Sequence, residues 1–209
     1  MTINSEHRST RRLNPTVRAE QILEEATRFF AERGFEAQVG DLASRLGVSE
    51  GLIFRYYRTK QALIEAVYDR VFIERWSETW QIDLVDRTVP VRQRVENFYL
   101  SFLDVVDDPL WIRIAMYAAL AGERMPVAYA ARARVERILQ VILEELRVAG
   151  FLPDDPAQEA IQWEMVTHLY SSVVYLLLRK HVYNRKFTQD RHAMVQRLIT
   201  NFFSEFERR

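Results

Sequence analysis

The spacing of apolar residues constrains the fold of this chain most, because it follows the helical period along most of the sequence. Near the start, Ile22, Ala26 and Phe29 are separated by three or four residues, as on one face of an α-helix. No window shows the sustained two-residue alternation that marks a half-buried strand. Gly and Pro are scarce, at 6 each in 209 residues, which argues against a turn-rich β protein. The sequence therefore predicts an all-α fold without a sheet.

Residues that start or stop helices divide the N-terminal part of the chain into four helices. The predicted starts carry an N-cap or a Pro, at Asn14-Pro15, Ser49 and Thr59. The predicted ends carry a glycine, at Gly34 and Gly47. We expect the helices from Pro15 towards Gly34, over about 40–46, over about 50–56, and from Lys60 to Trp80.

The remainder of the chain predicts longer helices. They are expected over 109–122, 126–149 and 156–184, and from after Thr188 nearly to the end. The stretch from Ile82 to Val89 is expected to be irregular. The last two of these helices carry broad apolar stripes, which are wide enough to pack inside one subunit and against a second helix pair.

Composition excludes several classes of protein. No segment approaches the roughly 18 apolar residues that span a bilayer, and the longest apolar run, Val173 to Leu178, indicates a buried helix. There is no Cys, so disulfides, thiolate metal sites and cysteine catalysis are excluded. No apolar leader opens the chain, and we expect a cytoplasmic protein.

The first alternative is an enzyme, but the sequence lacks the motifs that catalysis would require. A di-iron helical bundle needs Glu-x-x-His twice, whereas Glu164 and His168 are four residues apart and stand alone. There is no phosphate-binding loop and no Gly-x-Ser-x-Gly elbow. We therefore expect no catalytic residues, no metal site and no cofactor.

The two short helices around Gly47 have the pattern of a helix-turn-helix. Their apolar residues, which would pack against Phe29 and Phe30, are Leu42, Ala43, Leu46, Val48, Ile53 and Tyr57. Gly47 permits the left-handed conformation of a tight turn. Ser49 would leave the second short helix capped and pointing outwards, which reading base edges in the major groove requires.

This segment resembles the TetR family of regulators over roughly residues 15–65. The resemblance rests on Arg18, Ile22, Leu23, Ala26, Phe29, Gly34-Phe35, Asp41-Leu42-Ala43, Leu46-Gly47-Val48-Ser49, Gly51, Ile53-Phe54, Tyr56-Tyr57 and Thr59-Lys60. It implies nine or ten helices, with a three-helix DNA-binding head and a larger helical body for ligand binding and dimerisation. It also implies a homodimer that represses from a palindromic operator until an apolar or aromatic small molecule binds. The expected division is a flexible basic arm over 1–13, the head over 14–60 and the body over 61–209.

The resemblance and the chemistry of the residues together indicate the DNA contacts. We expect them from Arg11 and Arg12 of the arm and from Ser49, Glu50, Gly51, Leu52, Arg55, Tyr56 and Lys60. Arg55 suits either a guanine edge or a phosphate, and Glu50 either a cytosine amine or solvent. Three departures from the family pattern lie at Phe54, at Val39-Gly40 and at Glu50. They predict one missing phosphate contact, a poorly capped helix at Val39-Gly40 and an unusual acidic group.

The body offers candidates for an effector pocket and a dimer interface, although the same residues also suit plain core. The pocket candidates are Phe98, Phe102, Trp111, Met116, Tyr117, Met125, Tyr129, Trp163 and His168, with Glu164 and Arg113 as further polar anchors. The interface candidates are Tyr170, Val173, Leu177, Met194, Leu198 and Phe202.

The second alternative is a DNA-bound architectural or partner-recruiting protein without a small ligand, and activation remains open beside repression. An enclosed apolar void in the body favours induction by a ligand, and a filled core favours recruitment. The sequence leaves the operator, the effector and the regulated genes unnamed.

Overall fold

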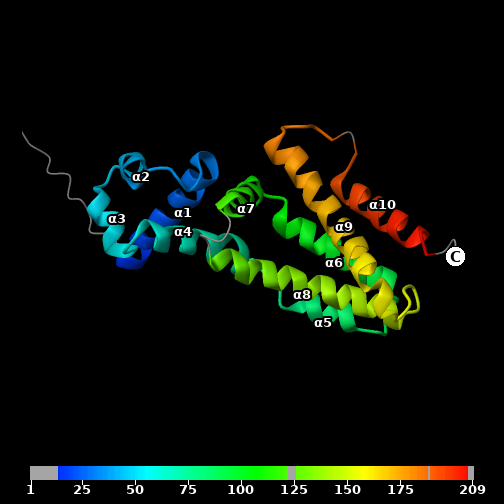
Figure 1. The fold of residues 1–209 in the computed structure, drawn as a ribbon. Helices are drawn as coiled ribbons and strands as arrows, with labels where there is room; N and C mark the ends of the chain where they lie inside the picture. The colour runs from blue at the N-terminus through cyan, green and yellow to red at the C-terminus, as the bar shows by residue number, and fades with distance from the viewer. Residues whose placement is uncertain (1–13, 122–125, 188, 207–209) are drawn as a thin grey trace, which may run out of the picture. The chain divides into compact units, whose positions relative to one another are not determined.

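The computed structural model of the chain describes residues 14–121, 126–187 and 189–206, in which every regular element is helical. These ranges contain ten α-helices, α1 to α10, and no strand, which confirms the all-α prediction (Figure 1). They fall into two compact units, of which unit 1 ends at Val67 and unit 2 begins at Tyr68. None of the described helices combines the length and apolarity that crossing a membrane requires.

Unit 1 is built from short helices whose starts are fixed by local capping. Its helices are α1 (Pro15–Arg33), α2 (Val39–Leu46), α3 (Glu50–Tyr56) and the first part of α4 (Lys60–Tyr68). The side chain of Asn14 accepts a hydrogen bond from the backbone N–H of Thr16 at 3.0 Å. The hydroxyl of Thr59 accepts one from Ala62 at the same distance. Both predicted caps are therefore confirmed.

The fourth helix crosses the limit between the two units. Leu63, Ile64 and Val67 on α4 are buried, and unit 1 as a compact body extends to Val67. The sequence placed the end of the DNA-binding head at residue 60, so this compact body includes one amphipathic helix segment more than the predicted head.

Unit 2 is a bundle of long helices. Its helices are α5 (Thr79–Val85), α6 (Val91–Val106), α7 (Pro109–Ala121), α8 (Pro126–Val148), α9 (Glu159–Leu177) and α10 (Arg191–Ser204). Helix α8 lies against α5 and α9, and α6 lies against α5 and α10 (Figure 1). Helices α9 and α10 also pack on each other.

A buried ion pair fixes α6 against α8 inside unit 2. The Arg94 guanidinium lies 2.8 Å from a carboxylate oxygen of Glu145, and both side chains are about 5% exposed. Arg94 also donates to the backbone oxygen of Val89 at 2.9 Å. Arg87, from the connection between α5 and α6, donates to the same carboxylate at 2.8 Å and 3.1 Å. Buried charges need such partners, so this cluster constrains how the helices pack.

Two sequence predictions about helix limits are wrong. The helix predicted from Lys60 to Trp80 ends as an α-helix at Tyr68 and passes into a π-turn over Asp69–Ile73. Residues 74–78 then leave the helical path before α5 begins. Helix α5 in turn occupies 82–85 of the stretch predicted to be irregular. Apolar residues keep helical spacing through the break, so periodicity alone does not reveal it.

Candidate functional site

The turn between α2 and α3 has the geometry that the sequence predicts. Gly47 adopts the left-handed conformation, with φ 65° and ψ 34°. A Cβ at this position would meet nothing within 4 Å, so the backbone conformation and not space calls for glycine. Ser49 is extended, and its hydroxyl accepts a hydrogen bond from the backbone N–H of Leu52 at 3.3 Å. The N-terminus of α3 is thus capped as expected.

The inward faces of α2 and α3 attach them firmly to the rest of unit 1. Leu42 and Ile53 have no exposed surface, and Phe30 of α1 is equally buried. The Tyr57 hydroxyl donates to the backbone oxygen of Ala19 on α1 at 3.2 Å. Helix α3 is short, but these contacts hold it in one orientation.

An ion-pair cluster also joins α1 and α2. The Arg45 guanidinium lies 2.6 Å from a carboxylate oxygen of Glu25 and 2.6 Å from one of Glu32. Hydrogen bonds to Glu32 raise the pKa of Arg45, desolvation opposes them, and the charges of Glu25 and Glu32 add to the rise. Arg45 is therefore engaged within unit 1. By contrast, α2 begins without a side-chain cap at Gln38, as the poor capping at Val39-Gly40 predicted.

The outward face of α3 carries the side chains expected to contact DNA. Ser49, Glu50, Gly51 and Arg55 are exposed, and Leu52, Tyr56 and Lys60 are half-buried. Arg11 and Arg12 lie outside the described residues. This face combines a guanidinium, a phenol and a carboxylate around a helix N-terminus, which together can donate to phosphates and both donate to and accept from base edges.

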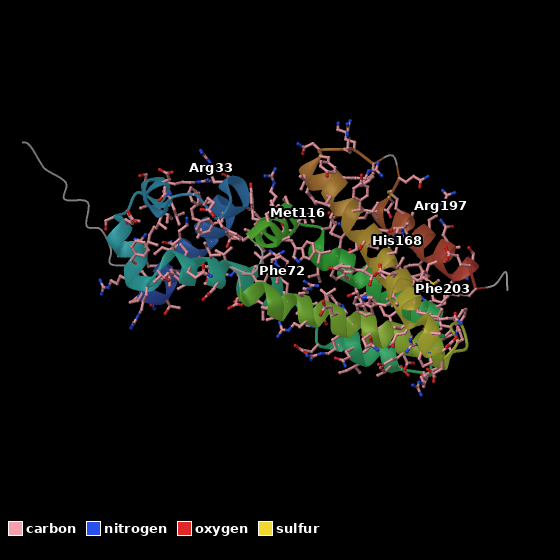
Figure 2. The ribbon with its side chains drawn as sticks, in the orientation of Figure 1. Arg33, Phe72, Met116, His168, Arg197 and Phe203 are labelled. Carbon is pink, nitrogen blue, oxygen red and sulfur yellow. The ribbon has the colours of Figure 1, made fainter. Side chains whose placement is uncertain are left out.

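Sequence reasoning passed over two further polar residues on unit 1. Arg58 is exposed in the turn between α3 and α4, and Ser44 is exposed on α2. The position of Arg58, two residues before Lys60, was the available indication of a second cationic side chain near Lys60. In Figure 2, Arg33 marks the end of unit 1 that is far from α3.

Unit 2 contains an aromatic cavity of about 30 Å³. Its lining residues are Phe72, Arg75, Trp76, Trp80, Phe102, Val105, Val106, Trp111, Ala131 and Val135. The rings form a continuous network in which Trp80 meets Phe102 edge-on at 5.8 Å between centroids. Phe102 meets Trp111 at 6.1 Å and Trp111 meets Phe72 at 5.3 Å. A volume this small holds one or two waters and no drug-sized molecule.

The structure brings only some of the predicted pocket residues to this cavity. Phe102 and Trp111 line it, and Phe98 packs behind it against Trp80 at 5.7 Å. Met116, Tyr117 and Trp163 are half-buried elsewhere in unit 2. Met125 lies outside the described residues, and so does the side chain of Tyr129.

The predicted polar anchors lie away from the cavity. His168 and Glu164 line a different, open groove between α9 and α10, and His168 is labelled on α9 in Figure 2. Arg113 is half-buried on α7 and does not line the aromatic cavity. Arg75 lines it instead. The sequence missed Arg75 because it placed this residue on a continuous helix, whereas the π-turn redirects the chain there.

The groove between α9 and α10 has a volume of about 510 Å³ and a mixed surface. It is lined by Ile161, Glu164, Met165, His168, Leu169, Ser172, Leu198, Asn201, Phe202 and Glu205. Among the predicted interface residues, Leu198 and Phe202 line the groove, and Met194 is half-buried on the same helix.

The remaining interface candidates turn inwards. Val173 and Leu177 are 0% and 2% exposed, so this chain's own helices already cover them. Tyr170 packs against Phe102 at 5.8 Å, within the aromatic network. The apolar pattern of a single helix could not show which positions are buried in the chain and which, like Leu198, line the groove. The residues that pack against them are far away in the sequence.

A charged cluster joins the end of α6 to α10 and to the π-turn that follows α9 (Leu178–Val182). The carboxylate of Asp107 accepts hydrogen bonds from Lys180 at 2.7 Å, from His181 at 2.7 Å and from Arg191. Burial raises the pKa of Asp107, but these hydrogen bonds lower it more, to about 2. The described residues hold no group of three His, Asp or Glu side chains arranged to bind a metal ion.

Comparison with known proteins gives one family match. Residues 22–67 match the model of the bacterial regulatory proteins of the tetR family. The HTH-type transcriptional repressor Rv3405c of Mycobacterium tuberculosis is 46% identical over 65 residues, which are 29% of this chain and 35% of that protein. The HTH-type transcriptional regulator LuxR of Vibrio harveyi is 28% identical over 105 residues, which are 49% of this chain and 50% of that protein. The chain thus matches about a third to a half of the length of these relatives.

Solved structures resemble the whole chain more evenly. The ketosteroid transcriptional regulator KstR2 of Mycobacterium tuberculosis gives a TM-score of 0.67 at 16% identity, covering 90% of this chain and 94% of that chain. The TetR family regulator PfmR of Thermus thermophilus gives a TM-score of 0.66 at 17% identity, covering 88% of this chain and 97% of that one. At such identities the likeness shows a common fold.

Proposed function

We propose, from the premise that this chain belongs to the tetR family of bacterial regulatory proteins, that it is a sequence-specific DNA-binding repressor. One observation carries the proposal: α3 is capped by Ser49 and anchored by the buried Ile53, while Gly51 and Arg55 remain exposed. A rigid, outward-facing helix start is what entry into a major groove requires. DNA binding is assigned to residues 14–60, with the arm over 1–13 adding phosphate contacts.

Each outward residue of the head has a specific part in this proposal. The N-terminus of α3 at Ser49 meets a phosphate, and Gly51 lets the backbone approach the bases closely. Arg55 donates to guanine or to a phosphate, and Tyr56 donates to the DNA backbone. Lys60 binds a phosphate from the start of α4. A cytoplasmic location follows from this role, because the operator lies on the bacterial chromosome.

The repressor acts as a homodimer, and the groove between α9 and α10 supplies the interface. The groove is open, and its apolar residues Ile161 and Leu198 are exposed and half-buried, so it is a surface that a second copy would cover. A two-fold contact between such pairs matches a palindromic operator, whose half-sites lie about 34–36 Å apart.

The experiment that tests the proposal is genomic footprinting of the full chain, followed by mobility shifts on the recovered site. Replacing Arg55 by Ala is expected to weaken specific binding by about 1–3 kcal/mol if it contacts a base. The matched control is Arg33→Ala, since Arg33 is exposed on the same unit but far from α3 (Figure 2). If Arg55→Ala binds the operator as tightly as the unaltered chain does, the assignment of α3 as the helix that reads the bases is wrong.

In the proposed mechanism a small molecule binds within residues 61–209 and releases the operator. An apolar or aromatic effector suits the rings around the cavity. The effector can lower the affinity for DNA only by the factor by which it binds the DNA-free conformation more tightly than the DNA-bound conformation.

One observation favours a second candidate, a DNA-bound protein that recruits partners without a small ligand. The cavity of about 30 Å³ among the aromatic side chains is too small for a drug-sized molecule. The two functions differ in one measurement: for a recruiting protein, no small molecule that binds unit 2 changes operator affinity.

A further inference from the structure

The aromatic cavity has one wall that differs from the others. Phe72, Arg75 and Trp76 are half-buried, as Val105 and Val135 also are, but these three alone come from the π-turn and from the non-helical residues that follow it. The opposite wall comes from α5, α6 and α7, where Trp80, Phe102 and Trp111 are buried. Phe72, Arg75 and Trp76 are the lining residues that lie outside the α-helices, so we assign the opening of the cavity to this wall.

Arg75 is the single charged residue among those that line the cavity in the described part of the chain. Its guanidinium lies 2.6 Å from a carboxylate oxygen of Asp108, at the junction of α6 and α7. The other carboxylate oxygen of Asp108 accepts the backbone N–H of Leu110 at 2.8 Å and so caps α7. The side chains of Arg75 and Asp108 are 34% and 25% exposed, so this ion pair lies at the solvent edge of the cavity, just outside its lining.

We propose that this cavity binds a small aromatic acid, whose carboxylate pairs with Arg75 in place of Asp108 while its ring enters between the tryptophans. The inference rests on the proposed function, because it names the chemical class of the effector. The planar guanidinium of Arg75 fits a carboxylate with two parallel hydrogen bonds. A neutral aromatic molecule leaves the Arg75–Asp108 pair intact, and an aromatic cation meets the charge of Arg75 unfavourably.

The size of the cavity requires an opening step. About 30 Å³ is far below the volume of a bicyclic ring, so the acid binds a conformation in which Phe72 and Trp76 have moved outwards. Because only a fraction of the molecules has the open conformation, the measured affinity is lower than the affinity of the open conformation itself, in proportion to that fraction. The moving residues follow directly on α4, which begins at Lys60 in unit 1. When Arg75 changes its carboxylate partner, the residues that move are therefore those that directly follow α4, the helix that begins in unit 1.

The test is titration of the full chain with naphthoate, followed by tryptophan fluorescence, because Trp76, Trp80 and Trp111 all line the cavity. Naphthamide is the neutral comparison of equal size. Asp108 reaches Arg75 through one oxygen, whereas a free carboxylate can use two, so we expect naphthoate to bind at least about tenfold more tightly than naphthamide, as one additional charge-assisted hydrogen bond predicts. Arg75→Met is expected to remove this preference, so that naphthoate and naphthamide bind equally tightly.

Two further variants separate the ion-pair exchange from general damage to the fold. Arg132→Met is the matched control, since Arg132 lies on α8 beside the lining residue Ala131 but is 73% exposed and pairs with Glu136. Asp108→Asn keeps a capping oxygen for α7 and removes the competing charge, so it should bind naphthoate several-fold more tightly. Equal affinity for acid and amide, no binding at millimolar naphthoate, or no gain in Asp108→Asn would each overturn the inference.

Mobility shifts of the same samples distinguish this inference from the proposed function. If naphthoate binds through Arg75 but no operator is found, the proposed aromatic-acid site is supported and the proposed repressor function is wrong. If an operator is found and naphthoate does not bind, the repressor stands and the aromatic-acid site fails.

Discussion

The two units of this protein relate to their sequences in different ways. Unit 1 contains residues 22–67, which match the model of the bacterial regulatory proteins of the tetR family. Over the whole chain, solved structures share the fold at 16–17% identity. A core needs only side chains of suitable size and polarity, whereas a recognition surface needs particular residues at particular positions. The family match thus lies within unit 1, whereas the likeness in fold extends over most of the chain.

The cores of the two units differ as well. Among the described buried residues of unit 1, Thr27 is the polar one, and its hydroxyl donates to the backbone oxygen of Leu23 at 2.7 Å. Unit 2 instead buries the Arg94–Glu145 pair and surrounds the carboxylate of Asp107 with cations. Both units have apolar cores, but the ion pairs that join α1 and α2 in unit 1 are partly exposed, whereas unit 2 buries charged contacts between distant segments.

The largest expected effect tests whether the two units unfold separately. Phe30 in unit 1 and Phe203 in unit 2 have no exposed surface, so replacing either by Ala should cost about 3–5 kcal/mol. Calorimetry is expected to show Phe30→Ala lowering one unfolding transition and Phe203→Ala another. Phe30→Ala should also abolish operator binding. A single transition that both variants lower equally would break the comparison, because the chain would then unfold as one body.

The next effect concerns acid stability and belongs to unit 2 alone. The pKa of Asp107 is lowered from 3.8 to about 2, so its stabilisation is complete above pH 4 and is lost as the pH falls from about 4 to 2. A shift of this size corresponds to about 2 kcal/mol. Asp107→Asn should lower the free energy of unfolding of unit 2 by that amount at neutral pH. The variant should also make this free energy depend less on pH between about 4 and 2.

Asp104→Asn is the control for this prediction. Asp104 also pairs with Arg191, at 3.0 Å, but it is 54% exposed, and exposed pairs contribute little. Equal losses in the two variants would mean that burial of Asp107 does not strengthen its contacts.

The same contrast explains what the sequence predicted and what it did not. The caps at Asn14, Ser49 and Thr59 depend on neighbours two or three residues away, and all three are confirmed. The partners of Asp107 lie 73 to 84 residues further along the chain, and no local pattern indicates them. Arg75 was missed for a related reason, since the π-turn before it follows apolar spacing that a continuous helix also satisfies.

A smaller effect sharpens the assignment of unit 1 to DNA. Lys60 starts α4 and is half-buried, which suits a phosphate contact and not base reading. Lys60→Gln should weaken binding to all DNA sequences alike and reduce the slope of log affinity against log salt by about 1. Arg33→Gln should leave the slope unchanged. Weakening by Lys60→Gln that is confined to the specific operator would instead assign Lys60 to base recognition.

The smallest effect uses the one poorly capped start among the first three helices of unit 1. Gln38 precedes α2 with φ −81° and ψ 138°, the extended conformation of an N-cap residue, but its side chain makes no capping hydrogen bond. A Ser at this position would present its hydroxyl to the first turn of α2, so Gln38→Ser should stabilise unit 1 by about 0.5–1 kcal/mol relative to Gln38→Ala. The gain should appear in the transition that Phe30→Ala lowers and not in that of Phe203→Ala. If Gln38→Ser and Gln38→Ala unfold alike, tertiary packing rather than capping holds the start of α2, because Val39 is already buried there.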